Sequence, residues 1–412
     1  MLFGKNENKN FKFTLMESTT IIENKIQELL KNFEFVRQST EHICSFLEIE
    51  DYVVQPIADV SPPKWHLGHT TWFFETFILI PNLKGYKVFD PKYNYVFNSY
   101  YETVGARVIR TDRGNLSRPS VSEIYSYRHY VDEHMRLLFK DVSAQSELKD
   151  ILELGIHHEQ QHQELLYMDI KYILGHNPLF PVYSDKKVFD EIIREQVKEL
   201  SFSEGVFEIG FQGEGFCFDN ELGRHQVYLD AFEIDPYPVS NKEYLEFMED
   251  GGYENFRFWH AAGWDWVNSN NVKAPLYWYF IDGQWMVFGL NGLKEMEGKQ
   301  AVCHVNYYEA AAFAAWKGME LPTEAQWEIA SKSLEWGHRW EWTQSAYLPY
   351  PRFKKAPGAI GEYNGKFMVD QMVLRGASVA TSKGHSRNTY RNFFKSHQRW
   401  QFSGIRLVKS LT

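Results

Sequence analysis

Cysteine is scarce in this sequence of 412 residues, and its scarcity limits the redox chemistry open to the chain. The three cysteines, Cys44, Cys217 and Cys303, lie far apart, and none belongs to a CxxC motif. An odd and scattered set argues against a disulfide framework and is typical of proteins in a reducing compartment. We therefore expect a cytoplasmic protein.

Long basic runs and long apolar runs are also missing. The formal net charge is −10, and without a basic stretch the chain lacks the electrostatic footprint of a nucleic-acid-binding protein. A membrane-spanning helix needs about 20 apolar residues, whereas the best candidate, 72–80, is interrupted by Glu75. We expect neither nucleic acid nor a membrane as a partner.

Helical periodicity dominates the first half of the chain. Apolar residues recur at helical spacing in four segments, 18–47, 61–80, 120–139 and 146–174. Ser120 and Glu123 have the spacing of a capping box at the start of the third segment, and Gly175 with Pro178 ends the fourth. Four helices with a long excursion between the second and the third predict a four-helix bundle over 18–180.

The rest of the chain has a different texture. Short apolar runs alternate with Gly, Asn and Asp, which predicts an irregular α+β domain over 205–412. We expect a linker over 181–204 that includes a helix from Phe189 to Leu200. The first residues, 1–17, have the composition of a disordered tail, within which Met16 offers an alternative start. The predicted fold class is therefore α plus α+β.

Histidines on two predicted helices have the spacing of a metal site. His158 and His162 lie four residues apart, so both imidazoles share one face of the fourth helix. The second helix offers His66 and His69, and bundles commonly build metal sites from facing helices. Three neutral imidazoles would leave coordination positions open, as the facial triads of non-haem iron enzymes do.

The same segment also matches the HExxH pattern of zinc proteases, in which the glutamate is the general base. The extended form of that pattern requires glycine where this chain has Leu165, which argues against a protease. Glu159 lies about 100° around the helix from His158. We expect its side chain behind the ligands or at the surface.

Five motifs, taken in chain order, resemble one known family. They are WHLGHTTWFFET, FNSYY, HHEQQHQELLYMDI, LPTEAQWEIAS and YRNFFKSHQRWQFSGIRLV. They are similar to those of the ergothioneine-type sulfoxide synthases over about 22–408. That family combines a DinB-like four-helix bundle with a lectin-like domain related to the formylglycine-generating enzyme. The resemblance implies an Fe(II) enzyme that uses O2 to join cysteine or γ-glutamylcysteine to the imidazole C2 of hercynine.

The resemblance also implies roles for particular residues. The family's metal ligands correspond to His69, His158 and His162, which leaves His66 as a neighbouring or core residue. Gln161 corresponds to the residue that hydrogen-bonds the histidine-derived substrate. In a substrate-binding lid formed by the C-terminal domain, the matching residues are Asn392, Phe393 and Phe394.

Two further features concern the sulfur donor. The FNSYY motif and Phe394, which stands where another branch has an acid, resemble the branch that takes free cysteine. Tyr100 and Tyr101 are the candidate acids that direct the reaction towards C–S bond formation. The arginines of the same excursion, Arg107, Arg110, Arg113 and Arg118, could hold the donor's carboxylate, because a guanidinium binds a carboxylate with two parallel bonds. The alternative is that they form a solvated basic loop.

Related activities remain as alternatives. Formylglycine chemistry is excluded, because that reaction needs two cysteines near the C-terminus and the chain has none after Cys303. Ovothiol-type synthases add a methyltransferase domain, and no glycine-rich methyl-donor site is present here. A selenoneine synthase of the same architecture stays open. A non-catalytic lectin-like ligand-binding protein is the alternative from another class, although it would not need three bundle histidines.

Overall fold

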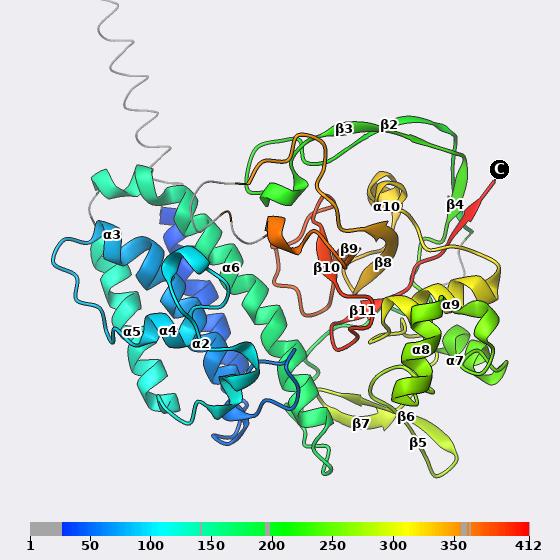
Figure 1. Ribbon diagram of the computed structural model, residues 1–412, viewed down its shortest axis with the longest axis horizontal. Helices are drawn as coiled ribbons and strands as arrows, with labels where there is room; N and C mark the ends of the chain where they lie inside the picture. Colours follow the sequence, from blue (N-terminus) through cyan, green and yellow to red (C-terminus); the bar gives the residue numbers. More distant parts are fainter. Residues whose placement is uncertain (1–26, 141, 194–197, 356–360, 362–363, 412) are drawn as a thin grey trace, which may run out of the picture. The chain divides into compact units, whose positions relative to one another are not determined.

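The computed structural model describes residues 27–140, 142–193, 198–355, 361 and 364–411. The chain forms two compact units (Figure 1). Unit 1 comprises the residues up to Ser99 together with Gly105–Leu166, and unit 2 comprises Tyr100–Val104 together with the chain from Tyr167 onwards. The predicted tail over 1–17 and the predicted start of the first helix lie outside the described residues.

Unit 1 is helical. Its long helices, which Figure 1 shows side by side, span 27–44, α2 (Pro63–Phe74), α5 (Val121–Leu138) and α6 (Val142–Gly175), the last of which continues into unit 2 after Leu166. Shorter helical turns are η1 (Asp51–Val53), η2 (Glu75–Leu79), α3 (Ile80–Asn82), α4 (Tyr93–Phe97) and η4 (Arg110–Asn115). The excursion between the second and third long helices therefore contains several short helical turns joined by irregular segments.

Local sequence explains where these helices start and change. The predicted capping box is present at the N-terminus of α5. The Ser120 hydroxyl accepts from the backbone N–H of Glu123, and the Glu123 carboxylate accepts from the backbone N–H of Ser120. The second predicted helix changes to a π-helical turn at Glu75. This buried carboxylate accepts the hydroxyl hydrogens of Tyr86 and Tyr127, each at 2.6 Å, which accounts for its place inside the bundle.

A buried group of charged side chains connects the four long helices. From the first helix, Arg37 donates to Thr71 on α2 at 2.9 Å, to Asp132 on α5 at 2.8 Å and to Glu159 on α6 at 2.9 Å. From α5, Arg128 donates to the same Glu159 carboxylate at 3.0 Å. We call these five residues the charged core of unit 1. All of them are buried, so the charges are stable only because they are paired and hydrogen-bonded.

Unit 2 mixes sheets and helices. Its four-stranded sheet has the order β10 (Asn392–Phe394), β9 (Met372–Ala377), β8 (Arg339–Ala346) and β11 (Ser403–Gly404), of which the β11–β8 pair is parallel. A three-stranded sheet has the order β1 (Leu200–Phe202), β4 (Phe232–Ile234) and β12 (Val408–Ser410). A two-stranded sheet pairs β2 (Gly205–Ile209) with β3 (His225–Leu229). Another three-stranded sheet has the order β5 (Trp278–Ile281), β6 (Gln284–Gly289) and β7 (Gly292–Glu295). The helices are α7 (Asn241–Glu249), α8 (Ala261–Asn270), α9 (Tyr307–Lys317) and α10 (Glu324–Ala330).

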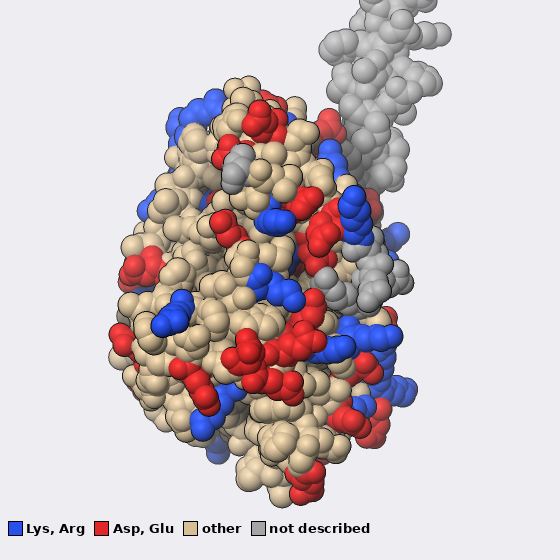
Figure 2. All heavy atoms as spheres, turned by 90° about the vertical axis from the view of Figure 1, so that its right-hand side faces the viewer, with Lys and Arg blue, Asp and Glu red and all other residues tan. Residues whose placement is uncertain are grey.

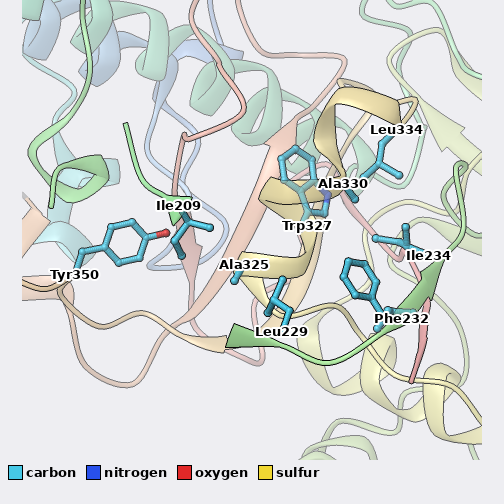
Figure 3. Close-up of a cluster of buried hydrophobic side chains, with 10 residues drawn as sticks. Ile209, Leu229, Phe232, Ile234, Ala325, Trp327, Ala330, Leu334 and Tyr350 are labelled. Carbon is cyan, nitrogen blue, oxygen red and sulfur yellow. The ribbon is translucent and has the colours of Figure 1, made fainter. Parts of the chain in front are cut away.

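Helix α10 contributes to a buried apolar cluster of unit 2 (Figure 3). Trp327 is fully buried there, and its indole N–H donates to the Glu341 carboxylate of β8 at 2.5 Å. From β4, Phe232 and Ile234 are also fully buried in the cluster. The remaining members are Ile209, Leu229, Ala325, Ala330, Leu334, Tyr350 and Val408. Residues from distant parts of the sequence thus form one core, which periodicity alone does not predict.

The predicted linker helix from Phe189 to Leu200 is wrong in its described part. Residues 189–193 and 198–199 are irregular, and Leu200 starts β1. Ile193 forms an isolated bridge with Gln300, and β1 pairs with β4. The backbone hydrogen bonds of this segment therefore go to residues far away in the chain instead of to a helix of its own.

The charge pattern of the surface and the hydropathy of the helices bear on the partners of the chain. On the face of the molecule drawn in Figure 2, acidic and basic side chains are interspersed. Among the described residues, no helix combines the length and apolar character that a membrane crossing requires.

The charged core should control stability in a pH-dependent way. Burial alone would raise the pKa of Glu159, but Arg37 and Arg128 hold it down to about 2. An unfolded glutamate has a pKa near about 4.3, so the ionised carboxylate stabilises the native state fully above that value. This contribution is lost as the pH falls towards 2. Glu159→Gln should lower the free energy of unfolding by about 3 kcal/mol near neutral pH, and the difference from wild type should shrink below pH ~4.3.

Urea unfolding between neutral pH and pH 3 measures this difference. Glu133→Gln is the matched control, because Glu133 is exposed on α5 and its loss should change stability by less than about 0.5 kcal/mol. A Glu159→Gln variant as stable as wild type at neutral pH would contradict the role given to the charged core.

Candidate metal centre

Helix α2 presents one histidine with a defined tautomer. His69 is fully buried, and its Nδ1 lies 2.6 Å from the carbonyl oxygen of Phe97. A carbonyl oxygen only accepts, so Nδ1 carries the hydrogen and donates it to Phe97. The lone pair of this neutral imidazole is therefore on Nε2, which is the arrangement expected of a metal ligand.

Gly68 allows the backbone of α4 to reach His69. A Cβ at position 68 would lie 2.3 Å from Cε1 of the Phe97 ring, closer than packed carbon atoms approach. Any larger residue would therefore push Phe97 away from α2. The absence of a side chain at Gly68 thus lets Phe97 pack closely against α2, where its carbonyl oxygen accepts from His69.

Helix α6 supplies the other two imidazoles. His158 and His162 are buried, and the ligand-capable atoms of these residues and His69 all lie within 4.8 Å of one another. The Nε2 atoms of His69 and His158 are 3.2 Å apart. Two nitrogens bound at about 2.1 Å to one ion, at an angle of about 100°, are about 3.2 Å apart. The predicted ligands therefore meet in space with a spacing that fits a single metal ion.

Burial keeps these imidazoles neutral. Desolvation is the largest cause of the lowered pKa of each one: it lowers the pKa of His158 to about 4 and the pKa values of His69 and His162 well below the usual range. Repulsion between neighbouring imidazoles adds to the effect at His69 and His162. Because only the neutral form offers a lone pair, the three side chains are ready to bind a metal ion at neutral pH.

Aromatic rings form the immediate surroundings of the cluster. The Trp65 ring stacks on His69 with centroids 4.6 Å apart, and the Trp72 ring stacks on the same imidazole at 5.6 Å. Phe73 stacks on His158 at 4.6 Å. These rings fix the orientation of the imidazoles and exclude water, so charges placed here interact more strongly than in solvent.

The arginines of the excursion differ in position. Arg113 is buried, and its guanidinium carbon lies 3.4 Å from the ring centroid of Trp65. By contrast, Arg110 is exposed and donates to the carbonyl oxygen of Asp59, while Arg107 is partly buried. Of the excursion's candidate arginines, the structure therefore places Arg113, rather than Arg107 or Arg110, against the aromatic ring that covers His69.

Glu159 points away from the histidines into the charged core. It is fully buried, so the alternative that it lies at the surface is wrong. Its carboxylate accepts from Arg37, Arg128 and Thr40 at 2.9, 3.0 and 2.7 Å. A carboxylate held by two guanidinium groups cannot serve as the general base of an HExxH protease, which removes the physical basis of that interpretation.

Gln161, also on α6, is partly buried next to His162.

Tyr100 and Tyr101 lie in a short segment that belongs to unit 2. The Tyr100 hydroxyl donates to the Tyr101 hydroxyl over 3.2 Å, and Tyr101 is buried. Lys366 holds this segment, because its ammonium group donates to the Tyr100 carbonyl at 2.5 Å and lies 4.4 Å from the Tyr100 ring centroid. The Phe367 ring is edge-on to Tyr100, with centroids 5.9 Å apart.

Strand β10 carries the three residues predicted to bind substrate. Phe393 stacks on Tyr347 at 4.1 Å, and its ring centroid is 5.8 Å from that of Phe367. Asn392 accepts from the backbone N–H of Phe393, and Phe394 packs edge-on to Trp400 at 5.5 Å. Within unit 2, Phe367 therefore lies between two predicted groups that are almost 300 residues apart in the sequence, Tyr100 and Phe393.

One contact of the candidate metal centre was expected only in general terms, as a place for His66 beside the ligands, and another was not predicted. His66 and His162 share a hydrogen bond between their Nδ1 atoms, 2.8 Å apart, for which the HxxH spacing on α2 was the available signal. The Phe97 carbonyl gave no signal at all, because a backbone atom can come from any residue type.

Comparisons with known proteins agree with the motif evidence. Residues 187–339 match the family described as the sulfatase-modifying factor enzyme 1-like domain. The hercynine oxygenase of Mycolicibacterium smegmatis is 31% identical over 258 residues, which are 50% of this chain and 59% of that protein. The hercynine oxygenase of Mycobacterium tuberculosis is 28% identical over 306 residues, or 63% of this chain and 71% of that protein. The chain is a relative of the hercynine oxygenases.

The predicted resemblance to the ergothioneine-type sulfoxide synthases is thereby confirmed, and so is the fold class of α plus α+β. The formylglycine-generating enzyme of Bos taurus is also similar, with 29% identity over 161 residues, which are 34% of this chain and 43% of that protein. The chain spans about 59% of the first hercynine oxygenase.

In this hercynine oxygenase relative, His158→Ala or His162→Ala should each abolish stoichiometric metal binding, because a three-ligand site loses one ligand. Metal content after anaerobic incubation of the apoprotein with Fe(II) and gel filtration measures the effect. His134→Ala is the control: that imidazole lies on α5, is only partly buried and is bonded to the carbonyl of Tyr130. One equivalent of iron retained by either ligand variant would refute the assignment.

Proposed function

We propose that the chain is an Fe(II)- and O2-dependent sulfoxide synthase that joins the sulfur of cysteine to the imidazole C2 of hercynine. The observation that carries this proposal is the buried group of three neutral histidines, without a carboxylate among its members, in a relative of the hercynine oxygenases. Three protein ligands leave coordination positions open for small molecules.

The proposed reaction balances with O2 as the oxidant. One C–H bond of hercynine and the S–H bond of cysteine are lost, and one C–S bond forms. One oxygen atom enters the sulfoxide, and the other leaves as water with both hydrogens. His69, His158 and His162 would hold the Fe(II), which would supply the redox chemistry with O2. The residues of the chain then have to orient the substrates and deliver or remove protons.

Gln161 is the proposed partner of the hercynine imidazole. It stands one position before His162 and three after His158, so it leaves α6 beside the ligand face. A side-chain amide both donates and accepts, and it orients an imidazole without forcing one protonation state. Asn392, Phe393 and Phe394 remain proposed substrate-binding residues on the resemblance.

A tyrosine of the pair at 100 and 101 is the proposed acid. These residues follow closely after Phe97, whose carbonyl holds His69. A phenol is protonated at neutral pH and can donate. Hydrogen bonding between the two hydroxyls would let one phenol support the other while a proton is given up. Lys366 would keep the segment in place through the Tyr100 carbonyl.

The proposal is tested by loading the apoprotein anaerobically with Fe(II) and then adding O2 and hercynine with one of three donors: cysteine, γ-glutamylcysteine or a selenosugar. Mass spectrometry should detect the hercynyl cysteine sulfoxide, and cysteine should be used better than the dipeptide. The His158→Ala variant provides the inactive control. Absence of any C–S or C–Se product with all donors would overturn the proposal. A clear preference for γ-glutamylcysteine would show that Phe394 does not determine the donor.

Phenylalanine at position 100 or 101 tests the acid. At least one variant should retain iron and both substrates yet form the C–S bond about 100-fold more slowly, the usual contribution of a positioned acid. Its main product should become cysteine sulfinate, in which both oxygen atoms add to the thiol. The ratio of sulfinate to sulfoxide measures the change. Wild-type ratios in both variants would move the proton donor to another residue, with Tyr390 as the next candidate.

A further inference from the structure

We propose that His66 is a positioning residue for the ligand His162, and that it fixes the hydrogen of that ligand by accepting its N–H. This inference rests on the proposed metal function of the site. The observation behind it is a hydrogen bond of 2.8 Å between the two Nδ1 atoms. His66 is 2% exposed and His162 is 8% exposed, so water does not compete for these atoms.

Only one of the two possible hydrogen positions leaves His162 able to bind a metal ion. If His66 donates, the Nδ1 lone pair of His162 is used, and a neutral His162 then carries its own hydrogen on Nε2. No lone pair is left for the ion in that arrangement. If His162 donates, its Nε2 lone pair is free. Metal binding therefore selects the state in which His66 accepts through Nδ1 and has its hydrogen on Nε2.

The three proposed ligands differ in how their hydrogens are fixed. His69 donates to a backbone carbonyl, which can never become a donor. The Nδ1 of His158 is buried and has no hydrogen-bond partner among the described residues. At His162 the partner is another imidazole, which can donate or accept. His162 is thus the ligand whose tautomer depends on the identity of one side chain, His66.

The position of His66 explains why it acts through His162. It stands three residues before His69 on α2, so both point from the same side of the helix. The group of mutually close ligand atoms contains His69, His158 and His162 but not His66. Partners behind a metal-bound histidine typically account for 10- to 100-fold in metal affinity (an order-of-magnitude range).

Two substitutions separate the hydrogen bond from packing. His66→Asn places a side-chain oxygen near the position of Nδ1, where it can accept from His162. His66→Leu fills a similar volume but cannot accept. Both variants are compared with wild type and with His134→Leu, which removes a histidine of α5 outside the cluster. Thermal unfolding of each apoprotein checks that the bundle is intact.

The measurement is the dissociation constant of Co(II) and of Fe(II), titrated anaerobically into the apoprotein. We expect His66→Leu to bind about 10- to 100-fold more weakly than wild type, with His66→Asn and His134→Leu close to wild type. In the Zn(II)-loaded wild type, ¹⁵N NMR of labelled histidines should show His162 with its hydrogen on Nδ1, and His66→Leu should lose this signature.

Each other outcome overturns the inference in a distinguishable way. Wild-type affinity in His66→Leu would show that His66 is only a packed core residue. Equal weakening in His66→Asn and His66→Leu would show that the imidazole shape matters and the hydrogen bond does not. Failure of the wild-type apoprotein to bind any of these metals would instead overturn the proposed function itself.

Discussion

The guanidinium group of Arg37 contacts a side chain on each of the other three long helices of unit 1: Thr71, Asp132 and Glu159. Removing charges from water is costly, and the cost is recovered only when the partners are all in place. A shift of one helix along another would break at least one of these bonds. The charged core therefore restricts the bundle to one register.

That register also determines where His69, His158 and His162 meet. Glu159 is the neighbour of His158 on α6, and Thr71 lies two residues after His69 on α2. Successive residues of a helix point in different directions, so Glu159 and Thr71 point into the charged core while the imidazoles of His158 and His69 pack against Trp65, Trp72 and Phe73. The polar side of these helices thus aligns them with one another. The aromatic side excludes water from the histidines, which keeps the imidazoles neutral.

The sequence predicted the elements that local patterns determine. Apolar spacing located the long helices, the capping box marked the start of α5, and the histidine spacing together with the family motifs named three residues that do meet in space. The linker helix was wrong because apolar spacing over a short segment does not distinguish a helix from a strand whose partner is distant. Leu200 starts such a strand.

The parts of the site that were missed depend on tertiary contacts. Nothing in the sequence marks Arg37 as buried, because an arginine is far more often exposed than buried. Four arginines in one excursion looked equivalent until Arg113 was found against Trp65. The sequence left open whether the Glu159 side chain is exposed or buried. Its ion pairs with Arg37 and Arg128, which lie far away in the sequence, explain why it is buried.

The close packing of Gly68 against Phe97 has a consequence for protein design. A designer who wished to graft the three histidines into another helical bundle would copy the ligands and their helix spacing. Without a glycine at the position before the first histidine, the carbonyl that accepts from its Nδ1 could not approach. The imidazole ring could then flip, or move its hydrogen to the other nitrogen. A transplant would therefore have to carry Gly68 and Phe97 as well as the histidines, although neither of these two residues supplies an atom that binds the metal ion.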